Sequence, residues 1–169
     1  MEFEEVVKLR TATRKFSAKK VPKKILERIL NIGRLAPTAK NLQPQKIYVL
    51  QSKESLNKID KITPCRYKAP LVLLVCSDKN VAWTSENYSS YEMDACIVAT
   101  HLILAATNLG VDNIWIRKFD SNEAKKVFDL PEHIEPICLI PLGYADKTYQ
   151  GNPSHTIRKA LSETVIYDK

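Results

Sequence analysis

The chain has 169 residues, of which 44% are hydrophobic, and a formal net charge of +7, so it is long and apolar enough for one globular domain and too apolar for a disordered chain. The longest unbroken apolar run, 71–76, is far shorter than the roughly 20 residues that cross a bilayer. The first residues, MEFEE, have neither a basic nor an apolar region typical of a signal peptide, and we therefore expect a cytoplasmic protein.

Hydrophobic periodicity predicts helices and strands that alternate along most of the chain. Helices are predicted at 3–10, 21–36, 54–62, 91–110 and 120–129, and strands at 46–51, 71–77, 113–116 and 136–144. The helix at 91–110 is apolar nearly all round and should be central, and Gly110 ends it. Residues 78–90 are polar and are predicted to be irregular. The pattern indicates an α+β fold in a single domain, 1–169.

The last residues, 145–169, have no obvious place in that compact unit. They nevertheless end in the apolar stretch TVIY at 164–167. Such a segment either packs on its own domain or reaches a partner, and the residues alone leave both options open.

The cysteines and histidines are scattered and indicate neither a disulfide framework nor a zinc site. We expect Cys76, Cys96 and Cys138 to be buried thiols because each lies in an apolar segment, and only Cys65 to be exposed. His101 lies on the apolar helix at 91–110 and is interpreted as a core or interface residue. Asp94 on the same helix is interpreted as structural.

Familiar catalytic motifs are absent from the sequence. There is no G-x-G-x-x-G, no P-loop, no G-x-S-x-G and no outstanding pair of carboxylates. Two stretches are nevertheless unlike core segments: LRTATRKF at 9–16, with three cations, and RLAPTAKNLQP at 34–44. A chain with anion-binding segments and no nucleophile can take its chemistry from a cofactor.

These two stretches, in this order, resemble those of the nitroreductase family of flavin proteins. That family typically has an R-R-S-x-R-x-F segment at the end of its first helix and then a helix that ends in A-P-S-x-x-N-x-Q-P. The resemblance continues through MDACIVATHLILAATNLGV at 93–111, NIWIRKFD at 113–120, PICLIPLGY at 136–144 and IRKALSETVIYD at 157–168. It implies a central mixed or antiparallel sheet flanked by helices. It also implies a homodimer in which the arm 145–169 is exchanged and two FMN molecules lie at the interface.

The resemblance assigns the first basic stretch to the FMN phosphate and ring. Arg10 and Arg158 are expected at the phosphate, with Lys159 as an alternative to Arg158. Thr11 and Ala12 stand where the family often has Arg and Ser, so Ala12 cannot supply a hydroxyl contact. Arg14 is expected near the pyrimidine edge of the flavin, where its charge would stabilise the anionic reduced form. The same cations would also suit an ordinary solvated surface.

The second stretch would come from the other subunit and pack against the flavin ring and ribityl chain. Its expected cofactor-binding residues are Pro37, Thr38, Ala39, Asn41 and Gln43. Asn41 offers both a donor and an acceptor to the polar edge of the ring. Gln43 is equally compatible with a structural role, and the whole stretch with an ordinary loop after a helix.

A third set of cofactor-binding residues follows from the strands at 113–116 and 136–144. The backbone N–H of Arg117 would face flavin N5, and Gly143 is also expected to contact the cofactor. Many family members have small or acidic residues where this chain has Arg117 and Lys118. The departure suggests a preference for anionic substrates or NADPH, unless both side chains point to solvent.

The resemblance therefore implies an FMN-dependent enzyme that transfers hydride from NAD(P)H to nitroaromatic, quinone or similar acceptors in two half-reactions. A specialised member of the family is an alternative, such as a dehalogenase, a flavin-fragmenting enzyme or an azoline oxidase. The rival from another class is a non-enzymatic module that stores FMN or binds nucleic acid. Sparse aromatic residues near the lysine pairs argue against base stacking. No metal, membrane or specific nucleic acid is expected.

Overall fold

A four-stranded antiparallel sheet lies at the centre of the computed structural model, which describes residues 1–168. Its strand order is β1-β2-β6-β5, and a separate hairpin is formed by β3 and β4. The strands are β1 Gln45–Leu50, β2 Leu71–Asp78, β3 Thr84–Ser85, β4 Tyr88–Ser89, β5 Asp112–Asn113 and β6 Ile134–Gly143. The two long inner strands, β2 and β6, are buried along almost their whole length, as expected for a sheet covered on both faces.

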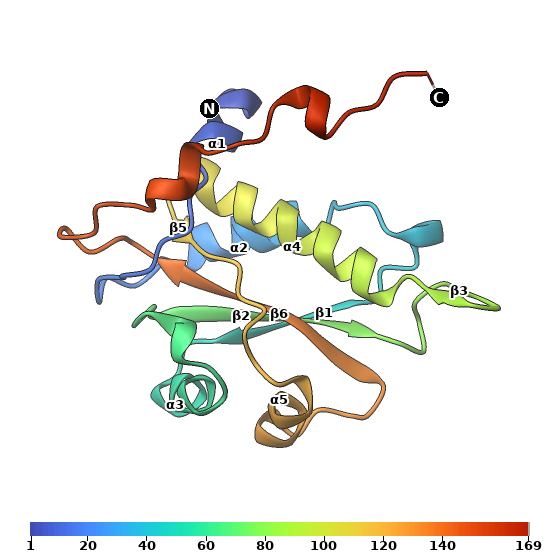
Figure 1. The fold of residues 1–169 in the computed structure, drawn as a ribbon. Coiled ribbons are helices and arrows are strands. Elements are labelled where there is room, and N and C mark those ends of the chain that lie inside the picture. The colour runs from blue at the N-terminus through green and yellow to red at the C-terminus, as the bar shows by residue number, and fades with distance from the viewer. Residues whose placement is uncertain (169) are drawn as a thin grey trace.

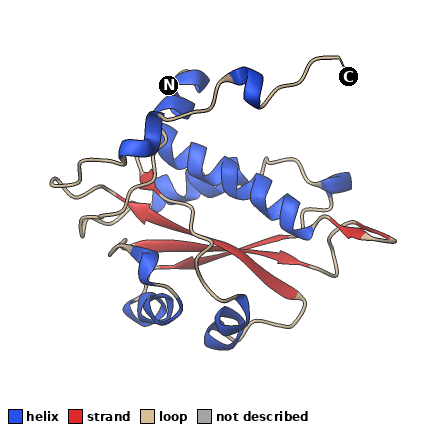
Figure 2. Ribbon diagram, in the orientation of Figure 1, coloured by secondary structure: helices blue, strands red, loops and turns tan. Residues whose placement is uncertain are grey.

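Helices cover both faces of this sheet (Figure 1; Figure 2). The helices are α1 Phe3–Leu9, α2 Lys23–Gly33, α3 Lys53–Ile62, α4 Tyr91–Asn108 and α5 Ser121–Phe128. Because side chains alternate across a strand, Leu73 and Val75 of β2 pack with α2 and α4. Val72 and Leu74 of the same strand pack with α3 and α5 on the other face. The α+β class and the flanked antiparallel sheet are thus confirmed.

Local signals in the sequence explain where several helices begin and end. The side chain of Ser52 accepts the N–H of Ser55 at the start of α3, and that of Asp120 accepts the N–H of Glu123 at the start of α5. Gly110 follows α4 with a φ of 71°, a left-handed conformation that favours glycine. Within residues 1–168, no helix combines the length and the apolarity that a bilayer crossing requires.

The predicted strand at 113–116 is wrong in extent, since β5 covers only Asp112–Asn113. The N–H of Ile114 donates to the carbonyl of Pro141 at 3.3 Å, but Pro141 has no N–H to return the bond. Pairing then resumes only as an isolated bridge between Ile116 and Leu139. The stretch 78–90 was expected to be irregular but contains the β3–β4 hairpin.

Two of the four predictions about cysteine burial are also wrong. Cys76 and Cys138 are buried as expected, whereas Cys96 is only half-buried and Cys65 is half-buried instead of exposed. Burial raises the pKa of the Cys76 thiol to about 12 and that of Cys138 further still. These two thiols therefore stay protonated at neutral pH and act as core residues.

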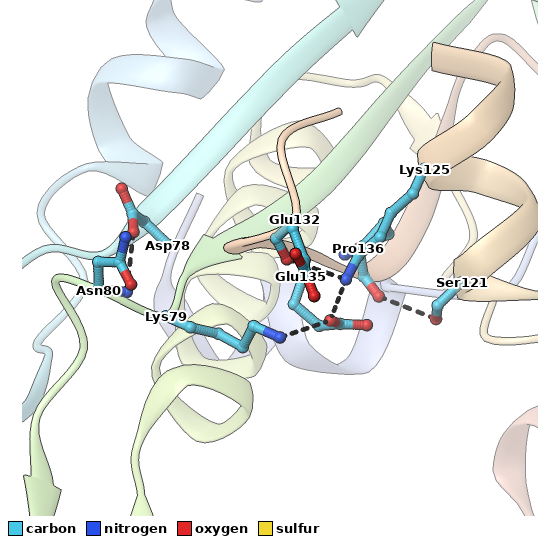
Figure 3. A network of polar contacts seen from close by, with 8 residues as sticks. All are labelled: Asp78, Lys79, Asn80, Ser121, Lys125, Glu132, Glu135 and Pro136. Atoms are coloured by element: carbon cyan, nitrogen blue, oxygen red, sulfur yellow. Dashed lines mark hydrogen bonds and ion pairs between the residues drawn. The ribbon is translucent and has the colours of Figure 1, made fainter. Parts of the chain in front are cut away.

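An ion-pair network joins α5 to β2 and β6 at the end of β6 remote from Gly143 (Figure 3). The Nζ of Lys125 lies 2.7 Å from Oε2 of Glu135, and the Nζ of Lys79 lies 3.4 Å from the same oxygen. The hydroxyl of Ser121 donates to the carbonyl of Pro136 at 3.2 Å. Because the single carboxylate of Glu135 holds two lysines from different parts of the chain, this cluster is a structural tie between elements.

The close approach of α2 and α4 predicts a cost for any side chain at Gly33. A Cβ there would lie 2.3 Å from Cδ2 and 2.8 Å from Cγ of Leu102. We expect Gly33→Ala to lower the free energy of unfolding by about 1–3 kcal/mol in a urea titration, although alanine is the better helix former by about 1 kcal/mol. In a Leu102→Ala background the same change should cost much less, and an equal cost in both backgrounds would contradict the steric explanation.

Candidate functional site

The segment 10–17, which contains most of the first basic stretch (9–16), runs along the sheet edge between the end of α1 and the end of β6. Its backbone is fixed by two bonds: the N–H of Thr13 donates to the carbonyl of Asn113 at 3.0 Å, and the N–H of Ser17 donates to that of Tyr144 at 2.8 Å. The hydroxyl of Tyr149 donates to the carbonyl of Ala12 at 2.6 Å. The predicted residues Arg10, Thr11, Ala12 and Arg14 therefore lie together beside β5 and the end of β6.

Among residues 1–168, the two arginines of this stretch have no acidic partner. Arg10 is half-buried at the end of α1, Arg14 is exposed, and within residues 1–168 neither forms an ion pair with a carboxylate. The hydroxyl oxygen of Thr13 between them is buried without a hydrogen-bond partner among the same residues. Unpaired guanidinium groups of this kind suit an anionic ligand with several oxygens.

Arg158 lies in the arm 145–169, and the arm returns to α1 before it leaves the domain. The Nε2 of His155 lies 2.8 Å from the carbonyl oxygen of Lys8, two residues before Arg10. The Nη1 of Arg158 donates to the carbonyls of His155 and Ile157, each at 2.7 Å. The segment that carries Arg158 is thus placed next to α1 (Figure 1), and Arg10 is the residue that follows this helix.

The backbone N–H of Arg117 lies at the outer edge of the sheet and, as far as residues 1–168 are concerned, is free to donate to a ligand. Ile116 exchanges two hydrogen bonds of 2.9 Å with Leu139, and because successive residues point to opposite sides, the N–H of Arg117 points away from β6. It donates no hydrogen bond within residues 1–168. The Arg117 side chain is exposed and folds over Phe119, with its Cζ 5.2 Å from the ring centre, and Lys118 is exposed as well.

Gly143 is buried, and its position has a packing explanation. A Cβ at this residue would lie 2.9 Å from Cδ of Pro70 and 3.0 Å from Cδ1 of Phe16. The missing side chain therefore lets Phe16 pack at the end of β6 and holds the 10–17 stretch in place. A direct contact between Gly143 and a cofactor stays a prediction.

The second stretch forms a tight turn against the start of α4. The N–H of Ala39 donates to Oδ1 of Asp94 at 2.8 Å, and the N–H of Gln43 donates to Oγ1 of Thr38 at 3.0 Å. The other oxygen of Asp94 accepts the hydroxyl of Ser90 at 2.7 Å. These contacts support the structural interpretation of Asp94.

This turn contains three non-glycine residues in the left-handed region. Lys40, Asn41 and Gln43 have φ values of 49°, 55° and 52°. Each such residue costs roughly 1 kcal/mol relative to an ordinary conformation, although asparagine tolerates it better than most. Pro37 is the first residue of this turn, 37–43, and is exposed. Strained backbone of this kind persists where the surroundings hold it, and it is typical of ligand-binding turns.

The two groups of predicted residues lie at opposite ends of α4 (Figure 1). Asp94, which holds the 37–43 turn, is in the first part of this 18-residue helix, whereas α1 packs near His101 and Leu104 toward its other end. A helix of that length spans about 27 Å. Within one chain, the 37–43 turn and the stretch that carries Arg10 are therefore separated along α4.

Two polar residues beside the site had not been predicted. Thr63 is buried, and its hydroxyl donates to the carbonyl of Lys118 at 2.7 Å. The carbonyl of Tyr67 accepts the N–H of Phe16 at 3.2 Å. Thr63 followed by proline at the end of a predicted helix is a recognisable turn signal, but the pattern does not show what the turn contacts.

His101, the histidine on α4, makes a local contact. Its Nδ1 lies 3.0 Å from the carbonyl oxygen of Ile97, one turn earlier in the same helix. Throughout the described residues, 1–168, no group of three or more His, Cys, Asp or Glu side chains is arranged to hold a metal ion.

The fold and these segments define an α+β protein in which two arginines without a carboxylate partner among residues 1–168 lie near one edge of the sheet. The chain belongs to the nitroreductase family, whose family model matches residues 7–65 and 64–144. Membership of this family makes it an oxidoreductase.

Individual relatives agree with this assignment. A crystal structure of a nitroreductase family protein from Clostridium difficile 630 is 38% identical, with a TM-score of 0.94 and coverage of 100% of this chain and 99% of the other. A Methanothermobacter thermautotrophicus protein, provisionally named NADH dehydrogenase/NAD(P)H nitroreductase, is 28% identical over 85% of this chain and 78% of its own length. The iodotyrosine dehalogenase 1 homolog of Caenorhabditis elegans is 25% identical over 86% of this chain and 55% of its own length.

Proposed function

We propose that the protein is an FMN-dependent oxidoreductase that uses NAD(P)H to reduce nitroaromatic, quinone or similar acceptors. The observation that carries the proposal is the set of unpaired arginines on the 10–17 stretch, which lies on the same sheet edge as the open N–H of Arg117. The family and the name of the Methanothermobacter relative support the same activity.

The residues present fit the phosphate end of FMN. A phosphate monoester carries close to two negative charges at neutral pH, and guanidinium groups bind its oxygens in a fixed, forked geometry. Arg10 and Arg158 would hold it, with the Thr11 hydroxyl as a further donor. Ala12 offers only its backbone, so this chain has one side-chain contact fewer than the usual family pattern.

When bound, FMN would supply the hydride chemistry, accepting hydride from NAD(P)H and passing electrons to the acceptor. The protein would orient it and tune its charge. Arg14 would place a positive charge at the pyrimidine edge, and the Arg117 N–H would donate to the ring from the sheet edge. Pro37, Asn41 and their neighbours would cover the ring from the second copy.

A homodimer would complete this site, and exposed apolar residues support it. An apolar groove of about 350 Å³ lies between α1 and α4, lined in part by Phe3, Val6 and Leu104. The arm carries Ile166 and Tyr167 with 74% and 76% of their surface exposed, an unusual exposure for side chains without a partner. An arm that crosses to a second copy would bury these residues.

The decisive experiment is an absorption spectrum of the purified protein before and after anaerobic NADPH. A yellow protein that NADPH bleaches supports the proposed reductase. A yellow protein that both nicotinamides leave unchanged indicates an FMN carrier. A colourless protein that shifts DNA at low salt indicates the basic nucleic-acid binder and overturns the proposal.

A specialised flavin enzyme is the second candidate, favoured by the dehalogenase name of the Caenorhabditis elegans relative. Between β2 and α4, where an additional lid could be inserted, this chain has only the short β3–β4 hairpin. The hairpin leaves little chain to enclose a dedicated substrate, which favours the plain reductase. The location in the cytoplasm stays a prediction.

Arg117 and Lys118 predict a preference for the more anionic nicotinamide. Both side chains are exposed at the proposed site, where their charges would attract the phosphates of the co-substrate. We expect Arg117→Gln/Lys118→Gln to raise the KM for NADPH about 3- to 10-fold in steady-state assays, with a smaller effect for NADH. Lys61→Gln, an exposed change on α3, is the control. Unchanged KM values for both nicotinamides would refute the charge argument.

A further inference from the structure

A short loop, 63–68, contacts both segments that would face the cofactor within one chain: the one that carries Arg117 and the one that carries Arg14. It follows α3 and includes a 3₁₀ turn at Pro64–Arg66. Its first residue, Thr63, is only 3% exposed and its hydroxyl makes two contacts. The hydroxyl donates to the carbonyl of Lys118 at 2.7 Å and accepts the N–H of Cys65 at 3.2 Å. This buried side chain therefore fixes the backbone directly after Arg117.

The other end of the loop contacts the basic stretch. The carbonyl of Tyr67 accepts the N–H of Phe16 at 3.2 Å, two residues after Arg14. The phenol of Tyr67 lies close enough to Arg14 for the charge of that guanidinium to act on its pKa. Burial raises the pKa of this phenol and Cys65 raises it further, whereas the charge of Arg14 lowers it. The phenol is thus a neutral neighbour of Arg14 at physiological pH.

The backbone of this loop has an unusual conformation that its neighbours hold in place. Tyr67 and Lys68 are consecutive non-glycine residues with φ values of 54° and 64°. Arg66 fastens this turn: its Nε and Nη2 donate to the two carboxylate oxygens of Asp60 at 2.7 and 2.6 Å. Its Nη1 donates to the carbonyl of Ala69 at 2.8 Å. Three hydrogen bonds donated by the Arg66 guanidinium therefore hold this strained turn in one conformation before any ligand binds.

We infer that Thr63 and Tyr67 are positioning residues, which hold the Arg117 backbone and the Arg14 guanidinium in fixed places beside the cofactor; the inference rests on the proposed function. An exposed arginine otherwise samples many rotamers, and ordering it opposes ligand binding. A phenol beside the guanidinium restricts those rotamers and removes part of that cost. The charge of Arg14 can tune a flavin ring only if it stays at the same edge of the ring.

The test compares Tyr67→Phe with the wild-type holoprotein. The change keeps the aromatic packing and removes the hydroxyl near Arg14. We expect the midpoint potential of bound FMN to become more negative, and its reduction by NADPH in stopped flow to slow about five-fold, the factor that one typical net hydrogen bond represents. Tyr48→Phe is the matched control, because Tyr48 is a half-buried tyrosine on β1 in the same apolar cluster.

Thr63 provides an independent pair of variants. Thr63→Val keeps the shape of the side chain without the hydroxyl, and we expect it to weaken FMN binding about five-fold in a fluorescence titration of the apoprotein. Thr63→Ser restores the hydroxyl and should bind FMN within two-fold of wild type. A purely structural role would lower the melting temperature of these variants without moving the potential or the FMN affinity.

The outcomes separate this inference from the proposal on which it rests. A wild-type protein that binds no FMN overturns both. A wild type that binds FMN and is reduced by NADPH, with Tyr67→Phe and Thr63→Val unchanged in potential, reduction rate and affinity, overturns the inference alone. A shift in Tyr67→Phe that the Tyr48→Phe control lacks, with rescue by Thr63→Ser, supports it.

Discussion

Replacing Arg10 with alanine is expected to raise the dissociation constant for FMN about 10- to 100-fold. A hydrogen bond to a charged group contributes about 1.5–3 kcal/mol, and Arg10 has no carboxylate partner within residues 1–168 that would offset its loss. The measurement is the quenching of FMN fluorescence by the apoprotein. The dissociation constant of Arg10→Lys should lie between those of wild type and Arg10→Ala, because lysine keeps the charge but not the forked geometry.

Salt and a control variant distinguish this effect from a general loss of positive charge. Arg28→Ala removes an exposed arginine of α2 and should leave the FMN affinity within about two-fold. The wild-type affinity should fall with rising ionic strength, and that of Arg10→Ala should fall less steeply. If Arg10→Ala and Arg28→Ala weaken FMN binding equally, Arg10 is one surface charge among many and the phosphate assignment is wrong.

Arg158 tests whether the arm shares in the same anion site. His155 contacts the carbonyl of Lys8, so the arm turn and the end of α1 are neighbours. Two contacts to one phosphate share a partner, so the affinity lost in a double variant of Arg10 and Arg158 should differ from the sum of the two single losses, whereas independent sites would give the sum.

The long apolar elements could be predicted because their burial is encoded locally. The stretch 71–77 is uniformly apolar and became the central strand β2, and 91–110 became the buried helix α4. The predicted extent of the strand at 113–116 was wrong because of a residue in the partner strand, since Pro141 cannot return a hydrogen bond to Ile114. Its own sequence contains no trace of that restriction.

The site residues show the same division between local and distant causes. The types and order of the residues at 9–16 and 34–44 were enough to indicate the family. The geometry of the second turn depends on Asp94, 55 positions from Ala39, and the backbone after Arg117 depends on Thr63, 55 positions from Lys118. No periodicity within either segment reports such a contact, and the left-handed residues of the turn include no glycine that would have signalled it.

Asp94→Ala should have the second large effect, because one buried carboxylate joins the turn to α4. Asp94 is 2% exposed, and its two oxygens accept the N–H of Ala39 and the hydroxyl of Ser90 at 2.8 and 2.7 Å. Its removal leaves both donors without a partner, and we expect a loss of about 2–4 kcal/mol in the free energy of unfolding by urea titration. The left-handed residues Lys40 and Asn41 lose the anchor that holds them, so FMN affinity should also fall at least about ten-fold.

Two milder variants separate the turn from general stability. Ser90→Ala removes the donor to Oδ2 and leaves the bond from Ala39 intact, so it should lower the stability by about 1 kcal/mol with FMN affinity nearly unchanged. Asp94→Asn keeps an oxygen for the N–H of Ala39 and should bind FMN better than Asp94→Ala. Equal FMN affinities for Asp94→Ala and Ser90→Ala, both folded at the assay temperature, would show that the 37–43 turn does not contribute to the cofactor site. Since that turn and Arg10 lie at opposite ends of α4, a loss of FMN affinity in both Arg10→Ala and Asp94→Ala, with Ser90→Ala unchanged, would support a cofactor site shared between two copies of the chain.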